Sequence, residues 1–285
     1  MNTQTRNNKH TVCNLVIFTI LVLASGWLGR WVDALMGSAS SEEGIGMLLW
    51  IIAPLGVSLL LRAFAGDGWK DLRIRPAIKG NGLWYAVSIL VYPACATLIL
   101  VIGLASGAVS FPGFSLVLFG QAFAMVLVQQ AIKNIFEEFA FRGYLAPKMY
   151  RLGLNVFVAH VVVGLIWGAW HLPYLQAITP YTTENLATLV PRFLAGAIAA
   201  SIVYGEIRIL TDSVWPAWLM HTVGATFIGA LNGLFTISSG MEFLVAPVFE
   251  GGLMIVLFTL TGVGIYLLRR KRATTAPAAP SEMSL

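Results

Sequence analysis

Long apolar stretches dominate the chain, and only short polar segments interrupt them. A helix needs about 20 consecutive apolar residues to cross the hydrocarbon core of a bilayer. The pattern therefore predicts an all-α, polytopic membrane protein with about eight transmembrane helices. Their expected positions are residues 12–29, 45–66, 81–107, 115–145, 154–175, 187–209, 213–235 and 247–268.

The same pattern suggests how the chain is divided. The first apolar run continues past the length of a signal peptide, so we predict that it is the first span. One transmembrane domain is expected over residues 1–272, with its most polar spans in a core at about 115–235. Residues 273–285 are small, proline-rich and polar, which predicts a disordered tail.

Composition and charge sharpen this prediction. Hydrophobic residues make up 58% of the chain and charged residues only 11%, whereas soluble domains carry about a quarter charged residues. The net charge of +5 comes from basic clusters between the apolar runs, so it indicates membrane topology rather than nucleic-acid binding. Every basic cluster falls on one side when both termini are cytoplasmic, which predicts a multi-pass protein of the cell membrane (inner or plasma membrane).

The fourth predicted span carries a cluster of ionisable side chains, Lys133, Asn134, Glu137, Glu138 and Arg142. Each charged group costs about 2.5–3.5 kcal/mol at a helix centre, so each needs a partner or a function. The spacing from Lys133 to Glu137, and from Glu138 to Arg142, permits two ion pairs along the helix. Two explanations of the cluster remain open: local ion pairs alone, or a reactive site.

Two histidines lie in other apolar spans. His171 follows Trp167 in the fifth span, and His221 lies in the seventh span after Pro216. His160, early in the fifth span, is expected to be structural or interfacial. A glutamate with two histidines fits a catalytic zinc site with an open position. It equally fits metal-free chemistry, in which a carboxylate activates water and the histidines stabilise an oxyanion.

These residues resemble the CAAX protease and bacteriocin-processing family of intramembrane proteases. Glu137, Glu138 and Arg142 match its EExxxR motif, and Trp167 with His171 matches its aromatic-xxx-His motif. The resemblance covers about residues 69–235. The third motif, a histidine followed four residues later by Asn or Asp, is only half present, since Ala225 follows His221.

The resemblance implies a metal-independent glutamic endopeptidase, with no cofactor. Glu137 would activate water, and His171 and His221 would orient that water and stabilise the oxyanion. Glu138, Arg142 and Trp167 would support them. The possible substitutes for the missing asparagine are Thr222, Thr226 and Asn134. The substrate would be a membrane-associated protein or peptide.

Other functions fit the same residues. Ala225 suggests a non-catalytic relative, such as a self-immunity factor or a scaffold. A zinc-dependent membrane hydrolase or a small-molecule transporter would use the same polar core. One geometric difficulty is expected: Glu137 lies about 15 Å from the cytoplasmic end of a span ending near Pro147, whereas His171 lies about 24 Å from the start of its span.

Overall fold

The computed structural model describes residues 3–37, 44–179 and 185–275. Long helices occupy the apolar stretches, and the pairing of two short strands is the only sheet within these ranges. The elements in chain order are α1 (Thr3–Leu35), α2 (Ile45–Phe64), α3 (Gly82–Ala105), β1 (Val109–Ser110), α4 (Leu116–Ala140), the π-helix η1 (Phe141–Leu145), α5 (Ala146–Arg151), α6 (Val156–His171), the 3₁₀-helix η2 (Leu172–Tyr174), α7 (Leu175–Ile178), α8 (Leu186–Thr211), α9 (Trp215–Leu231), β2 (Thr236–Ile237), α10 (Glu242–Val245) and α11 (Gly252–Thr275).

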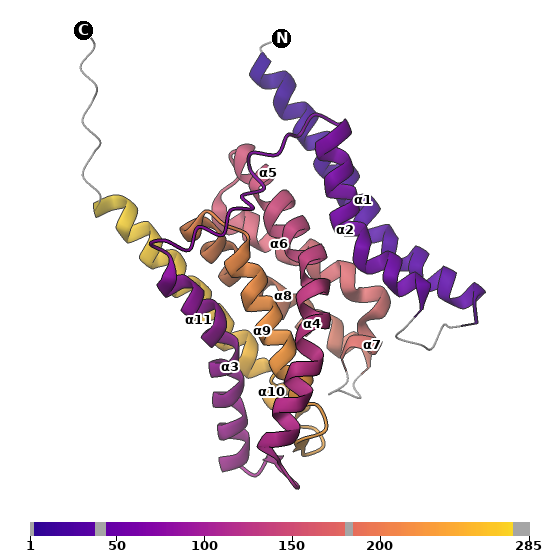
Figure 1. Ribbon diagram of the computed structural model, residues 1–285, viewed down its shortest axis with the longest axis vertical. Coiled ribbons are helices and arrows are strands. Elements are labelled where there is room, and N and C mark those ends of the chain that lie inside the picture. The colour runs from indigo at the N-terminus through magenta and orange to yellow at the C-terminus, as the bar shows by residue number, and fades with distance from the viewer. Residues whose placement is uncertain (1–2, 38–43, 180–184, 276–285) are drawn as a thin grey trace.

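Seven helices in the described ranges are long and apolar enough to cross a membrane. The remaining predicted span is α9, whose 17 residues extend about 25 Å, slightly less than the bilayer core. The prediction of an all-α polytopic membrane protein is confirmed. The start of α1 and the end of α11 lie at one end of the bundle, together with α5 (Figure 1). That this end is cytoplasmic stays a prediction.

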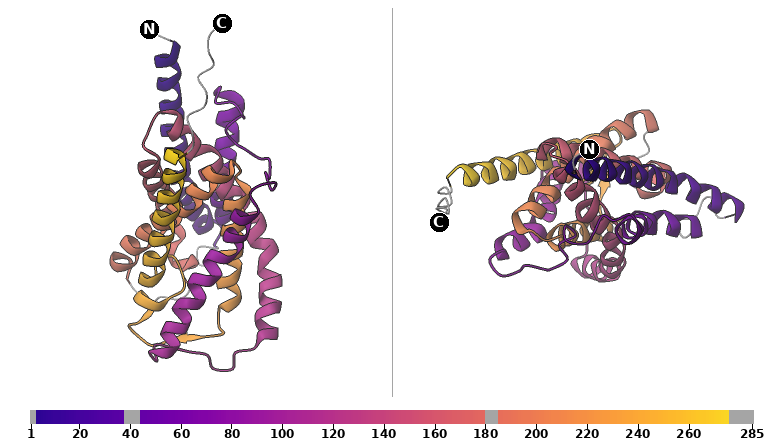
Figure 2. Two further views of the ribbon diagram at one scale, coloured as in Figure 1. Left: turned by 90° about the vertical axis from the view of Figure 1, so that its left-hand side faces the viewer. Right: turned by 90° about the horizontal axis from the view of Figure 1, so that it is seen from above.

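The helices are not all equally integrated. α1 and α2 pack on each other and lean away from the remaining helices, and the last turns of α11 project on another side (Figure 2). α4 packs against α9, α6 packs against α8, and α8 packs against α9. The helices that carry the sequence motifs therefore lie together in the bundle.

Glycine allows α6 and α8 to approach closely. A Cβ atom at Gly164 would lie 2.6 Å from the Cα of Ile198 and 3.0 Å from the carbonyl oxygen of Ala197. Small residues at helix contacts are a general feature of membrane bundles, because they let backbones meet. This contact fixes the distance of His171, at the end of α6, from the rest of the bundle.

The fourth span is longer than predicted. α4, η1 and α5 form one helical run from Leu116 to Arg151, although the sequence suggested an end near Pro147. Proline lacks the N–H that would bond to the carbonyl of Gly143 four residues earlier. Arg62, in the last turn of α2, donates from Nη2 to that carbonyl at 2.7 Å. The π-helix just before Pro147 and this outside donor let the helix continue.

The segment between α2 and α3 is held against the end of the bundle that carries α5. The Asp71 carboxylate pairs with Arg62 at 2.6 Å and with Lys148 at 2.9 Å. Burial alone raises the pKa of Asp71, but hydrogen bonds from Lys148 and Arg62 outweigh burial, so its pKa lies below the usual value. The segment is thus anchored by an ionised aspartate.

The C-terminal end differs slightly from expectation. A disordered tail was predicted over residues 273–285, but α11 continues through Thr275. The other predicted tail residues, 276–285, lie outside the described residues.

Candidate active site

Glu137 is buried on α4, and three side chains contact its carboxylate. Lys133 Nζ lies 2.9 Å from Oε1, which confirms the predicted pair along the helix. Trp167 donates from its indole N–H to Oε2 at 2.8 Å. His171 Nε2 lies 3.7 Å from the same oxygen. Two residues of α6 therefore hold and face one oxygen of this carboxylate.

Glu138 faces a different set of partners, because neighbouring residues on a helix point about 100° apart. Its Oε1 accepts from Arg142 Nη1 at 3.0 Å, the second predicted pair, and lies 2.9 Å from His221 Nδ1 on α9. Glu138 is fully buried, as is Arg142. The two adjacent glutamates thus connect α4 to α6 and to α9.

Arg142 is stabilised by aromatic rings as well as by Glu138. Its guanidinium carbon lies 4.4 Å from the ring centre of Trp167 and 4.8 Å from that of Tyr204. Its Nε and Nη2 atoms have no hydrogen-bond partner among the described residues. Cation–π contacts with desolvated rings contribute about 2 kcal/mol or more each. These ring contacts explain how the buried guanidinium of Arg142 is stabilised at this position.

The depth difficulty for His171 disappears because the fourth span runs on to Arg151. Glu137 lies fourteen residues, or about 21 Å, before Arg151. His171 lies fifteen residues, or about 22 Å, after Val156, where α6 begins. The two helices run from the same tight turn, so equal lengths bring the two side chains level.

Hydrogen bonds define which histidine nitrogens are available. His171 Nδ1 lies 2.8 Å from the carbonyl oxygen of Trp167, which only accepts, so Nδ1 carries a proton. In the neutral ring, Nε2 is then an acceptor beside Glu137. His221 uses Nδ1 toward Glu138, which leaves its Nε2 for other contacts.

A cavity of about 560 Å³ opens beside this cluster. Lys133, His171 and His221 line it, as does Ala225. Apolar side chains from α2, α7 and α8 form another part of its wall, among them Trp50, Ile178 and Phe193. The site thus combines ionisable groups with an apolar wall large enough for a peptide segment.

Ala225, where the family motif has Asn or Asp, faces this cavity. None of the three predicted substitutes is among the lining residues. Thr226 donates its hydroxyl to the carbonyl of Thr222 at 2.7 Å. The hydroxyl of Thr222 and both amide atoms of Asn134 are buried and find no hydrogen-bond partner in the part of the chain that the structure describes. Their assignment as substitutes stays a prediction.

His160 belongs to a separate buried network. Its Nε2 lies 3.0 Å from Glu206 Oε1 on α8, and Arg269 of α11 donates to both oxygens of Glu206. His160 is only 1% exposed, so it is structural rather than interfacial. This network ties α6, α8 and α11 together away from the cavity.

Sequence reasoning missed the aromatic support of His171. Trp50 of α2 stacks on Trp170 with ring centres 4.5 Å apart and on Tyr174 at 4.7 Å. It also donates from its indole N–H to the carbonyl of Trp170 at 2.9 Å. The neighbours of His171 in sequence were a usable signal, but Trp50, 120 residues before Trp170, had none.

These observations define a multi-pass membrane protein with a buried carboxylate–histidine site beside a cavity. Residues 119–227 match the family model described as type II CAAX prenyl endopeptidase Rce1-like. The matched segment contains Glu137, His171 and His221, and the match confirms the predicted resemblance to the CAAX protease and bacteriocin-processing family. A search of curated proteins found no match to the chain.

Proposed function

We propose that this protein is an intramembrane endopeptidase that hydrolyses a peptide bond of a membrane-associated protein or peptide, with Glu137 activating the attacking water. The observation that carries the proposal is the placement of the Glu137 carboxylate 3.7 Å from His171 Nε2, beside the cavity. Lys133 and Trp167 fix this carboxylate from two sides. A carboxylate and an accepting imidazole nitrogen side by side suit a water that donates one O–H to each.

Such a water presents its lone pair to a substrate carbonyl in the cavity. As the new C–O bond forms, one water proton passes to Glu137 and the carbonyl electrons move to the oxygen. His221 lines the cavity, and its Nε2 donates to this oxyanion when the ring is doubly protonated. Collapse of the intermediate breaks the C–N bond, and Glu137 returns the proton to the leaving amine.

Supporting roles follow from contacts. Glu138 holds His221 through Nδ1, and Arg142 compensates the charge of Glu138. Trp167 donates to Glu137 and accepts from His171 through its carbonyl, so one residue orients both groups. Within the described residues, no group of three or more His, Cys, Asp or Glu side chains is arranged to hold a metal ion. We therefore propose metal-free chemistry over the zinc alternative.

Direct attack by water is tested with purified protein in lipid nanodiscs and a panel of membrane-anchored peptides, prenylated and unprenylated. We expect cleavage in H₂¹⁸O to place one ¹⁸O in the new C-terminal carboxylate. We also expect that hydroxylamine yields no hydroxamate and that 1,10-phenanthroline leaves the rate unchanged. A hydroxamate product would show a covalent acyl intermediate, and loss of activity that zinc restores would show a metal enzyme.

Ala225 offers a test in the direction of higher activity. The Ala225→Asn substitution adds an amide donor on the cavity wall, one turn from His221. Loss of one oxyanion donor costs about 10²–10³ in rate, so we expect this gain to raise kcat by at least about tenfold. Ala225→Leu, which adds similar bulk without a donor, is the matched control. Equal rates for both variants would contradict an oxyanion role at this position.

Ala225 also motivates a second candidate function, a non-catalytic member of the family that binds a peptide in the same cavity. The position where the family motif places a polar group is apolar here and faces the cavity. Such a protein would keep its function after loss of the Glu137 carboxylate, whereas an endopeptidase would not.

A further inference from the structure

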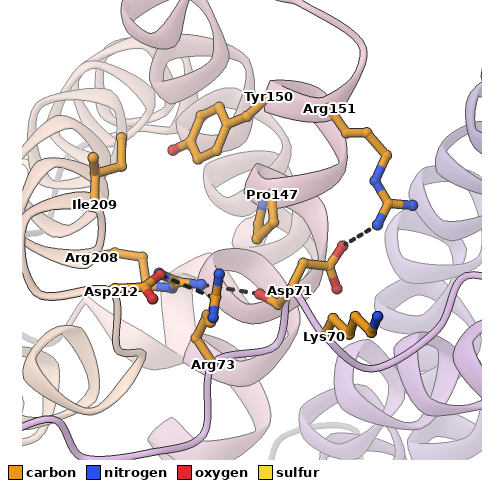
Figure 3. A pocket seen from close by; sticks show the side chains of 9 residues that line it. All are labelled: Lys70, Asp71, Arg73, Pro147, Tyr150, Arg151, Arg208, Ile209 and Asp212. Carbon is orange, nitrogen blue, oxygen red and sulfur yellow. Dashed lines mark hydrogen bonds and ion pairs between the residues drawn. The ribbon is translucent and has the colours of Figure 1, made fainter. Parts of the chain in front are cut away.

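A second cavity, of about 380 Å³, lies at the end of the bundle that carries α5. We call it the basic pocket; the polar side chains that line it are Lys70, Asp71, Arg73, Tyr150, Arg151, Arg208 and Asp212. They come from the segment between α2 and α3, from α5 and from the end of α8 (Figure 3). Glu137 lies about 20 Å from this end along the helix, so the pocket is separate from the candidate active site.

The charges in the basic pocket do not balance. Four of its side chains are cations and only two are anions. Asp71 is already engaged by Arg62 and Lys148, which lie outside the pocket lining. Asp212 pairs with Arg73 Nε at 3.1 Å and with Arg208 at 3.6 Å. The pocket therefore carries an excess of positive charge after its internal pairs are counted.

Several donors in the basic pocket have no acceptor among the described residues. Arg73 uses only Nε, so its two terminal nitrogens remain available. Arg208 is 6% exposed, and its Nε is buried without a hydrogen-bond partner. The contact of Arg151 with Asp71 is long, at 3.5 Å, and its side chain is half exposed. Figure 3 shows the guanidinium groups of Arg73 and Arg208 close together beside Asp212.

The backbone of the basic pocket is strained where these charges meet. Arg73 has φ of 53° and Asp212 has φ of 48°, in the left-handed region that non-glycine residues rarely adopt. Aspartate tolerates this region better than arginine. Both side chains are more than half exposed, and exposed ion pairs contribute little. The pair alone does not explain why Arg73 is held this way, and strain of this kind concentrates at ligand sites.

The surroundings of the basic pocket have the composition typical of a membrane surface. Trp69, Ile74 and Ile78, in the same segment as Lys70 and Arg73, are more than half exposed. Tryptophan is enriched at the level of lipid headgroups, and apolar neighbours there contact acyl chains. Basic pockets between transmembrane helices on the cytoplasmic side commonly bind acidic lipid headgroups. Exposed apolar side chains in this segment thus lie next to cationic ones. The apolar side chains suit the acyl chains of a lipid, and the cationic ones suit its phosphate.

We propose that the basic pocket binds the phosphate of an anionic phospholipid headgroup. Guanidinium groups match phosphate oxygens with paired N–H donors, and Arg73 and Arg151 supply such groups. Arg208, whose Nη2 donates to the Asp71 carbonyl at 3.0 Å, adds positive charge to the pocket. The Tyr150 side chain also lines the pocket, between α5 and α8. The proposal depends on this pocket alone and stands whether or not the protein is a protease.

The test uses full-length protein in dodecyl maltoside with short-chain phosphatidylglycerol, short-chain phosphatidylcholine, or inorganic phosphate. Native mass spectrometry counts bound lipid, and a titration of thermal stability gives the dissociation constant. We expect one phosphatidylglycerol per chain, bound at least tenfold more tightly than phosphatidylcholine. The variant Arg73→Gln/Arg151→Gln should weaken phosphatidylglycerol binding at least tenfold. Both side chains are half exposed, so the variant is expected to fold.

The matched control is Arg75→Gln/Lys79→Gln, which removes the same amount of charge from the segment that carries Arg73 but outside the basic pocket. Its phosphatidylglycerol affinity should stay within about twofold of wild type. Equal weakening in both double variants would overturn the proposal in favour of a general surface potential. Inorganic phosphate binding as tightly as phosphatidylglycerol would overturn the lipid assignment and indicate a soluble phosphate ligand. No difference between the wild-type and Arg73/Arg151 proteins would overturn the site itself.

Discussion

Replacing Glu137 with glutamine is expected to lower kcat for peptide hydrolysis by at least about 10³-fold, with KM changed only a few-fold. Glutamine keeps the volume of the side chain and its capacity to accept from Trp167, but it cannot take a proton from water. A positioned general base contributes about 10²–10⁴ in rate, and Glu137 also carries the proton to the leaving group. Single-turnover kinetics on a membrane-anchored peptide separate this loss from binding.

The loss must not come from misfolding. Glu137→Gln leaves Lys133 without its carboxylate, but Lys133 is 25% exposed on the cavity side and can be solvated there. Glu242→Gln on α10 removes a carboxylate outside the cavity and serves as the matched control. We expect equal expression and thermal stability in both variants, with activity lost in only one. Loss of both thermal stability and activity in Glu137→Gln would indicate instead that the carboxylate is structural.

Replacing Arg142 with methionine is expected to reduce the free energy of unfolding by about 3–5 kcal/mol. Methionine fills much of the same volume between Trp167 and Tyr204, so the main change is loss of charge. Glu138 then stays buried without its compensating cation, and breaking a buried pair costs about this much. Equilibrium unfolding of the protein in bicelles measures the change.

Two further variants separate pairing from packing. Arg151→Met removes a half-exposed cation at the end of the same helical run, and we expect a change below about 0.5 kcal/mol. The double variant Glu138→Gln/Arg142→Met removes both charges and should recover at least half of the lost stability. No recovery would place the role of Arg142 in its ring contacts rather than in the ion pair.

The sequence was sufficient for local relations. Spacing along one helix predicted the pairs Lys133–Glu137 and Glu138–Arg142, because residues four apart share a helix face. Long apolar runs predicted the bundle, because only helices satisfy their own backbone groups in lipid. The motifs also identified α4, α6 and α9 as the helices that meet.

Longer-range relations were not readable from one sequence. Pro147 indicated a helix end, and only the Arg62 donor, 81 residues from the Gly143 carbonyl, reveals why the helix continues. Distance in sequence also hides the contact of Asp71 with Lys148, which comes from a different helix. Trp50 gave no signal at all, because a tryptophan in an apolar span is compatible with any neighbour.

Glu137 is proposed to perform peptide hydrolysis in the membrane. This role is tested most directly by quantitative comparison of protein termini in cells that express the wild-type protein, Glu137→Gln or Glu242→Gln at equal levels. We expect a set of new termini on membrane-associated proteins in cells with the wild-type or Glu242→Gln protein, and their loss with Glu137→Gln. The same termini in all three cell lines would contradict it.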